Sequence, residues 1–161
     1  MQMKRKLLLV CLGLPLAVGA LSSYLTRRDM DAWAQEAVRP AFYPPDWVFP
    51  AVWTMLFALM GIASYRVLRA RRKQGVAVYR IRIALAYYLL SLAVNFAWPF
   101  VFFRWQAYAV ALAVLGALFY VTLRTYHTFS AVDRSAGYLL APYLVWLIYA
   151  GYLNLAVALL N

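Results

Sequence analysis

Five long runs of apolar residues, separated by short polar connections, dominate the sequence. They occupy residues 7–25, 47–67, 81–103, 107–123 and 137–160. A helix needs about 20 apolar residues to cross a bilayer, and backbone groups in hydrocarbon must form their hydrogen bonds within the segment. The pattern therefore predicts an all-α membrane protein with one domain, residues 1–161, built from five transmembrane helices. Residues 26–46 are predicted to form the loop between the first two helices.

Two segments admit a second interpretation. Residues 1–20 contain three basic residues, an apolar stretch and Val18-Gly19-Ala20, a combination that is also typical of a cleaved signal peptide. The third and fourth runs are separated only by Arg104-Trp105-Gln106 and could form one helix. Such a helix would exceed 40 residues, about twice the thickness of a membrane, so a turn at the membrane surface is favoured.

Composition and charge place the chain in the membrane and predict its orientation. The sequence is 66% hydrophobic and 13% charged, with a net charge of +11. The basic residues lie between the apolar runs, which argues against nucleic acid as a partner. If the chain crosses the membrane five times, twelve of its sixteen basic residues lie on the same side as the N-terminus: Lys4, Arg5, Lys6, Arg66, Arg69, Arg71, Arg72, Lys73, Arg80, Arg82, Arg124 and Arg134. The positive-inside rule then predicts a cytoplasmic N-terminus, with the first loop and the C-terminus outside.

The segment that leads into the second run is rich in proline and aromatic residues. Residues 39–50 contain four prolines, which fix φ and remove backbone donors, so this stretch is predicted to be stiff and extended. Its aromatic side chains are Phe42, Tyr43, Trp47 and Phe49. A belt of aromatic residues at the membrane surface is one interpretation. A belt does not require four prolines, and a rigid cover over a pocket is favoured.

Three of the predicted helices carry aromatic residues beside a small or polar residue on one face. These stripes are Trp53 and Phe57; Asn95, Trp98 and Phe102; and Pro142, Trp146, Ala150 and Asn154. An unpaired amide in hydrocarbon is costly, so Asn95 and Asn154 are predicted to face the interior, as packing contacts or as ligand contacts. Together the stripes favour a flat apolar cavity with a polar side chain in it.

Small residues form ridges on two of the helices. Ala109, Ala113 and Ala117 share one face of the fourth run, and Ala93 and Ala97 share one face of the third. Such ridges allow close helix approach, either within the bundle or between protomers.

The residues needed for most enzyme chemistry are missing from the sequence. A single cysteine, Cys11, and a single histidine, His127, exclude a Cys/His metal site within one chain. We expect a lipid-facing thiol at Cys11 and a solvated imidazole in a connection at His127. No phosphate loop, zinc-protease motif or Ser/His/Asp set is found, and no metal or cofactor is expected. The five carboxylates all lie outside the apolar runs, which argues against a proton-coupled transporter.

These motifs resemble those of the TspO/MBR family, the tryptophan-rich sensory proteins and translocator (peripheral benzodiazepine receptor) proteins. The resemblance lies in Pro44-Pro45-x-Trp47-Val48-Phe49-Pro50-x-x-Trp53-Thr54, in Asn95-x-x-Trp98, and in Pro142-Tyr143-Leu144-x-Trp146-x-x-x-Ala150-x-x-Leu153-Asn154. The first run, with Gly13-x-Pro15 and Gly19-Ala20-Leu21, is similar to that of bacterial members, which retain it. The resemblance therefore favours a membrane span over a signal peptide.

The resemblance implies a five-helix bundle, often a homodimer, that binds porphyrins, sterols or benzodiazepine-type ligands beneath the first loop. The implied ligand-binding residues are Phe42, Pro45, Trp53, Phe57, Asn95, Trp98, Trp146 and Ala150. If ligands are degraded in light, as in some bacterial members, Trp53 and Trp146 would take part.

Two departures from the family pattern bear on the ligand. Ser91 stands where the family often has glutamine, and no basic residue follows Tyr152, as the sterol-binding pattern requires. A porphyrin or haem-type tetrapyrrole is therefore favoured over cholesterol. The leading hypothesis is a membrane receptor or sensor in a bacterial membrane that influences tetrapyrrole levels by transfer or degradation. A small transporter of tetrapyrroles, sterols or other amphipathic molecules and a ligand-regulated scaffold are the alternatives.

Overall fold

The computed structural model describes residues 2–70 and 77–161, and every element in this part of the chain is helical. The helices are α1 (Gln2–Glu36), α2 (Val48–Ala70), α3 (Val78–Pro99), the π-helix η1 (Phe100–Arg104), α4 (Tyr108–Val132), α5 (Arg134–Tyr138) and α6 (Ala141–Leu160). Within the described residues, five helices are long and apolar enough to cross a membrane. The predicted five-helix fold is thus confirmed, with α5 and α6 together forming the fifth span.

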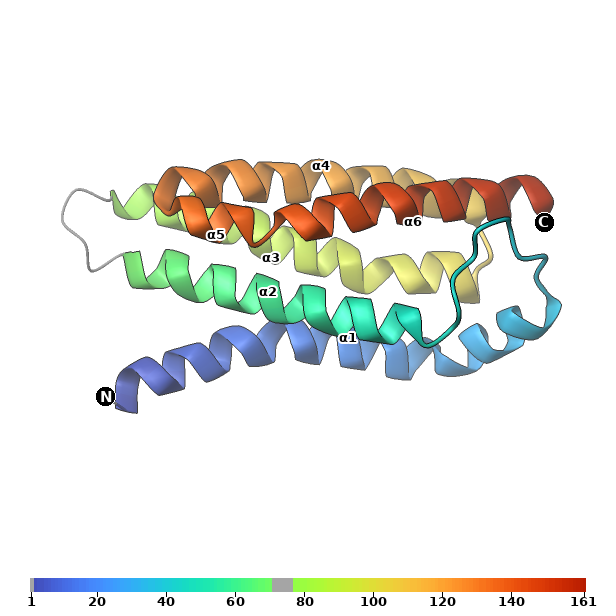
Figure 1. Cartoon of the computed structure of the whole chain (residues 1–161), viewed down its shortest axis with the longest axis horizontal. Coiled ribbons are helices and arrows are strands. Elements are labelled where there is room, and N and C mark those ends of the chain that lie inside the picture. The colour runs from blue at the N-terminus through green and yellow to red at the C-terminus, as the bar shows by residue number, and fades with distance from the viewer. Residues whose placement is uncertain (1, 71–76) are drawn as a thin grey trace.

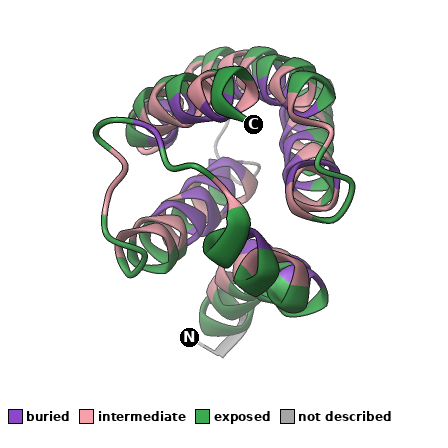
Figure 2. Cartoon of the chain, turned by 90° about the vertical axis from the view of Figure 1, so that its right-hand side faces the viewer, coloured by how far each residue is buried: buried purple, intermediate pink, exposed green. Residues whose placement is uncertain are grey.

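The helices run lengthwise beside one another and form an elongated bundle (Figure 1). α1 begins at the same end of the bundle as α5, and we call this the basic end because Arg66, Arg69, Arg124 and Arg134 lie there. The opposite end carries residues 37–47, which we call the lid, and the end of α6. Seen from the lid end, the helices surround an interior to which the buried residues are turned (Figure 2).

The prediction that residues 26–46 form a loop is wrong for its first part. α1 continues to Glu36, and only residues 37–47 connect it to α2. Hydropathy marks the part of a helix that lies in hydrocarbon, and this helix continues beyond that part. The continuation buries Trp33, which is 3% exposed although the sequence placed it in a loop. Ser22, Thr26 and Trp33 are all buried and lie at a helical spacing, and this spacing is the only trace of the helix in the sequence of this segment.

α1 packs closely against α2 at two glycines. A Cβ atom built on Gly61 would lie 2.7 Å from the carbonyl oxygen of Cys11 and 2.8 Å from the Cα atom of Leu12. At Gly19 a Cβ atom would overlap with the ring of Phe57. Cys11 itself is buried, so the expectation of a lipid-facing thiol is wrong. Because residues 11–20 form part of the packed bundle, the structure favours the membrane-span interpretation of this segment.

The connection between the third and fourth spans is the predicted turn. Pro99 lacks a backbone N–H, and the chain continues from α3 as one turn of π-helix before it turns at Trp105, which is 67% exposed. Arg104 fixes this turn to α1, since its guanidinium donates to the Asp29 carboxylate at 3.0 Å and to the Leu25 carbonyl at 2.9 Å.

α4 is longer than predicted, and this changes the position of His127. The helix runs past residue 123 to Val132, so that His127 lies on the exposed face of a helix and not in a connection.

The alanine ridges of α3 and α4 lie on the outside of the bundle. Ala93, Ala97, Ala109, Ala113 and Ala117 are all exposed, so they do not mediate packing within the protomer.

Candidate ligand site between α2, α6 and the lid

Aromatic residues of α2 contact α6 in the half of the bundle nearer the lid. The ring centroid of Trp53 lies 5.7 Å from that of Phe57 and 5.9 Å from that of Tyr143. Trp53 is half-buried, whereas Phe57 and Tyr143 are buried. From α3, the side-chain amide of Asn95 donates a hydrogen bond to the Tyr143 hydroxyl. Two of the predicted site residues, Trp53 and Asn95, therefore contact Tyr143, which the sequence analysis did not single out as a site residue.

Trp146 occupies the neighbouring position, one turn further along α6. Its ring packs edge-on against Phe49 at the start of α2, with 6.1 Å between the centroids, and lies 5.4 Å from the ring of Tyr149. Its indole Nε1 is buried and has no hydrogen-bond partner within the part of the chain that the structure describes. Ala150, one turn beyond, packs against the same core. A buried donor without a partner is costly, and a bound acceptor would remove that cost.

Trp98 contacts a second aromatic cluster nearer the lid end. It stacks on Phe102 at 4.9 Å, and its Nε1 donates to the Asn154 side-chain oxygen at 3.4 Å. The Asn154 amide in turn donates to the Tyr108 carbonyl at 2.9 Å. Asn95 and Asn154 are both buried, so the prediction that they face the interior is confirmed. Asn154 serves here as a packing contact between three helices.

The two predicted lid residues do not point into this site. The ring of Phe42 is 86% exposed, and Pro45 is also exposed. Phe42 instead takes part through its backbone, because its carbonyl oxygen accepts a hydrogen bond of 2.8 Å from the Tyr149 hydroxyl. Trp53, Phe57, Asn95, Trp146 and Ala150 are thus brought together, Trp98 lies beside them, and Phe42 and Pro45 lie on the outer surface.

The lid carries its own ion pair. Arg39 and Asp46 lie 3.2 Å apart, and the Arg39 guanidinium stacks over the Tyr43 ring at 5.1 Å. Burial raises the pKa of the Tyr43 hydroxyl, and the nearby Asp46 carboxylate raises it further. These contacts join the two ends of the lid to one another but do not hold its middle part, residues 41 and 42.

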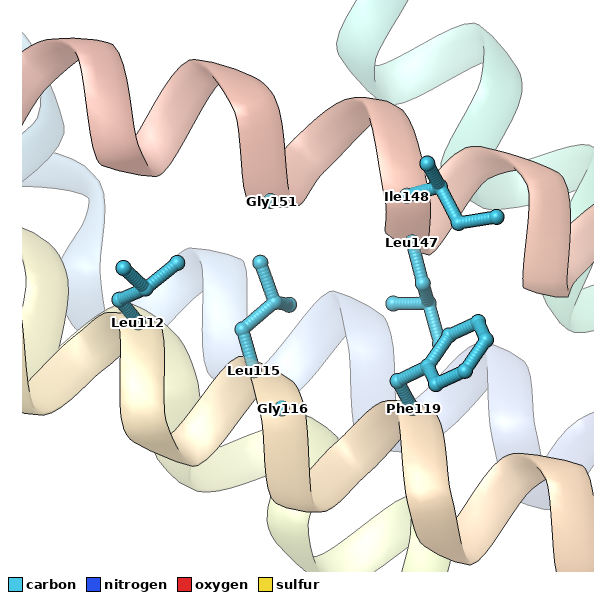
Figure 3. A pocket seen from close by; sticks show the side chains of 7 residues that line it. All are labelled: Leu112, Leu115, Gly116, Phe119, Leu147, Ile148 and Gly151. Carbon is cyan, nitrogen blue, oxygen red and sulfur yellow. The ribbon is translucent and has the colours of Figure 1, made fainter.

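Two cavities lie outside the predicted site. A groove of about 330 Å³ opens between α4 and α6 (Figure 3). Its lining is apolar and consists of Leu112, Leu115, Gly116, Phe119, Leu147, Ile148 and Gly151. A more polar cavity of about 230 Å³ at the lid end is lined by Trp33, Glu36, Ala37, Gln106, Tyr108 and Asn161. Neither is lined by any of the eight predicted ligand-binding residues.

Comparison with known proteins identifies the family. The TspO/MBR family model matches residues 11–160. The chain belongs to the TspO/MBR family. The tryptophan-rich protein TspO of Chlorobaculum tepidum is 34% identical over 154 residues, which cover 96% of this chain and 95% of the relative. The tryptophan-rich sensory protein of Cereibacter sphaeroides is 35% identical, with 95% of this chain and 88% of the relative covered. The translocator protein of Bos taurus is 34% identical, with 88% and 82% covered.

Membership of the TspO/MBR family agrees with the architecture described above. The matched residues include the lid, the aromatic residues of α2 and α3, and the α6 stripe from Pro142 to Asn154. Five apolar helices together with the TspO/MBR match make the chain an integral, multi-pass membrane protein of a sensor and transporter family.

Proposed function

We propose that this TspO/MBR protein is a membrane receptor that binds a porphyrin-type tetrapyrrole between α2, α6 and the lid. The observation that carries the proposal is the unpartnered indole N–H of Trp146, buried beside Phe49 and Tyr149. A tetrapyrrole is complementary to this site in two ways. Its flat apolar face can stack on the aromatic rings, and its carboxylate can accept a hydrogen bond from the indole N–H.

Binding requires the aromatic rings to move apart. Trp53 and Phe57 contact one another, as do Trp146 and Phe49, so a flat ligand would replace ring–ring contacts with ring–ligand contacts. Trp53 and Trp146 are only half-buried, so neither ring is held by packing on all of its sides. Phe57 is packed against Gly19 of α1 and would form the fixed wall.

The receptor would influence tetrapyrrole levels by handing the ligand on or by light-dependent degradation, in which Trp53 and Trp146 would be the side chains nearest the ligand. Its orientation would place the basic end in the cytoplasm and the lid outside. The exposed alanine ridges of α3 and α4 are the surfaces on which a homodimer would form. Net ligand flux into proteoliposomes would instead support the alternative of a small transporter.

The test is a titration of the purified protein with protoporphyrin IX, haem and cholesterol side by side, followed by tryptophan quenching. Replacing Trp53 or Trp146 by phenylalanine keeps an apolar ring but removes aromatic area and, at Trp146, the donor. Loss of such a stacking contact is worth about 1–3 kcal/mol, so porphyrin affinity should fall about tenfold. Ala150→Phe should fill the site and weaken binding as well.

The matched control is Trp105→Phe, because Trp105 is exposed and lies in the turn before α4. Trp33 is unsuitable as a control because it is buried in a separate aromatic cluster. The proposal fails if Trp105→Phe loses as much affinity as the site variants, or if Ala150→Phe binds like the parent. Either result would mean that porphyrin only partitions onto an apolar surface.

A further inference from the structure

Two side chains of α6 and that of Asn161, the residue after it, hold the lid at three points along its length. The Tyr149 hydroxyl donates to the Phe42 carbonyl at 2.8 Å, and the Tyr152 hydroxyl donates to the Ala41 carbonyl at 2.9 Å. Nearer α1, the Val38 amide donates to the Asn161 side-chain oxygen at 2.9 Å. The two tyrosines are three residues apart, so both hydroxyls project from one face of α6 toward consecutive carbonyls of the lid.

The turn that receives the two hydroxyls has an unfavourable backbone. The Tyr43 amide donates to the Pro40 carbonyl at 3.3 Å, which closes a four-residue turn with Ala41 and Phe42 in the middle. Phe42 has a φ of 60°, a conformation that favours glycine and costs energy in a residue with a Cβ atom. Since its ring is 86% exposed, packing of the ring does not compensate for this cost. Contacts from outside the turn must therefore hold it.

Tyr149 also contacts the candidate ligand site. Its ring lies 5.4 Å from the ring of Trp146 and 6.4 Å from that of Tyr152, with which it is stacked at 23°. The same side chain thus touches the tryptophan proposed to contact the ligand and bonds to the lid. A movement of Trp146 by a bound ligand would displace the Tyr149 ring and, with it, the hydroxyl that the lid depends on.

We propose that Tyr149 and Tyr152 are positioning residues that latch the lid over the site, and that Tyr149 couples the position of Trp146 to the closure of the lid. The latch depends on the proposed function in one respect only, namely that the molecule whose entry and exit it controls is a tetrapyrrole. Both hydroxyl bonds lie at the exposed surface, where water competes for the same carbonyls, so the latch opens readily.

The first experiment needs no ligand. Amide hydrogen exchange is followed by mass spectrometry over residues 37–47 in the parent, in Tyr149→Phe, in Tyr152→Phe and in the double variant. Each lost hydroxyl should speed exchange about threefold to tenfold, and the double variant should exchange fastest. Tyr120→Phe is the matched control, because Tyr120 is exposed on α4, far along the chain from the lid contacts. Exchange in the double variant equal to that of the parent would overturn the latch.

The second experiment measures ligand exchange by stopped flow with protoporphyrin IX. Association and dissociation should both accelerate in the double variant, whereas the equilibrium affinity should change less. In the parent, added protoporphyrin should itself speed amide exchange in residues 37–47. Unchanged rates in a variant whose lid amides exchange faster would refute control of ligand access. A parent that binds no protoporphyrin would refute the proposed function, and amide exchange would still decide the latch.

Discussion

The side-chain amide of Asn95 on α3 donates a hydrogen bond to the hydroxyl of Tyr143 on α6, 48 residues further along the chain and inside the bundle. Both side chains are buried. This contact joins two spans next to the candidate ligand site.

Tyr143→Phe should destabilise the bundle by about 1–2 kcal/mol, because it leaves the buried amide of Asn95 without its acceptor. Combining Tyr143→Phe with Asn95→Leu removes both polar groups, so the double variant should lose less stability than the sum of the two single variants. Unfolding in detergent measures all three. Strictly additive losses would show that the two side chains do not interact.

The spans could be predicted from the sequence, whereas most contacts of the site could not. Apolar runs must lie in lipid, and a buried amide such as Asn95 must face the interior, so both follow from residue type alone. Tyr149 and Tyr152 bond to backbone carbonyls of the lid, and a carbonyl acceptor leaves no mark in the sequence. The helical course of residues 26–36 was missed because hydropathy identifies contact with lipid and not helical conformation.

Gly61→Ala should destabilise the protein by about 1–3 kcal/mol, because the new methyl group would press against the backbone of α1 at Cys11 and Leu12. Gly116→Ala is the matched control, since a Cβ atom there meets nothing within 4 Å. The control should match the parent or be slightly more stable, because alanine favours helix more than glycine does. Thermal unfolding in detergent compares them, and equal loss in both variants would contradict close packing at Gly61.

The ion pair between Arg66 and Asp133 should make stability depend on pH. Burial raises the pKa of the Asp133 carboxyl, but hydrogen bonds from the Ala136 amide and Arg66 outweigh this and hold its pKa below the ordinary value of 3.8. The stabilisation is therefore complete above that ordinary value and is lost as the pH falls through the lower pKa of the folded state.

Asp133→Asn keeps an oxygen that can cap α5 but removes the charge. At pH 7 the variant should be less stable than the parent by about 0.5–1 kcal/mol, because the Arg66 side chain is partly exposed. Below the folded pKa of Asp133 the two proteins should unfold alike. A difference that persists at low pH would assign the effect to the cap instead of the ion pair.

Fusion reporters should confirm the proposed orientation, which rests on the basic residues between the spans. A reporter that is active only outside the cytoplasm should work when fused after Asn161 and fail when inserted near Gln74, which lies outside the described residues. The reverse pattern would overturn the orientation, and equal signals at both positions would indicate dual insertion.

The length of α1 has a consequence for how the protein responds to its membrane. The helix has 35 residues and is about 52 Å long, whereas the hydrocarbon of a bilayer is about 30 Å thick. Residues 26–36 make up about 16 Å of that length, and the Asp29–Arg104 pair ties this part to the bundle. The helix thus holds the lid at a fixed height above the apolar run. Longer acyl chains would raise the hydrocarbon boundary toward the lid, so bilayer thickness would set whether a ligand meets the proposed site from lipid or from the headgroup layer.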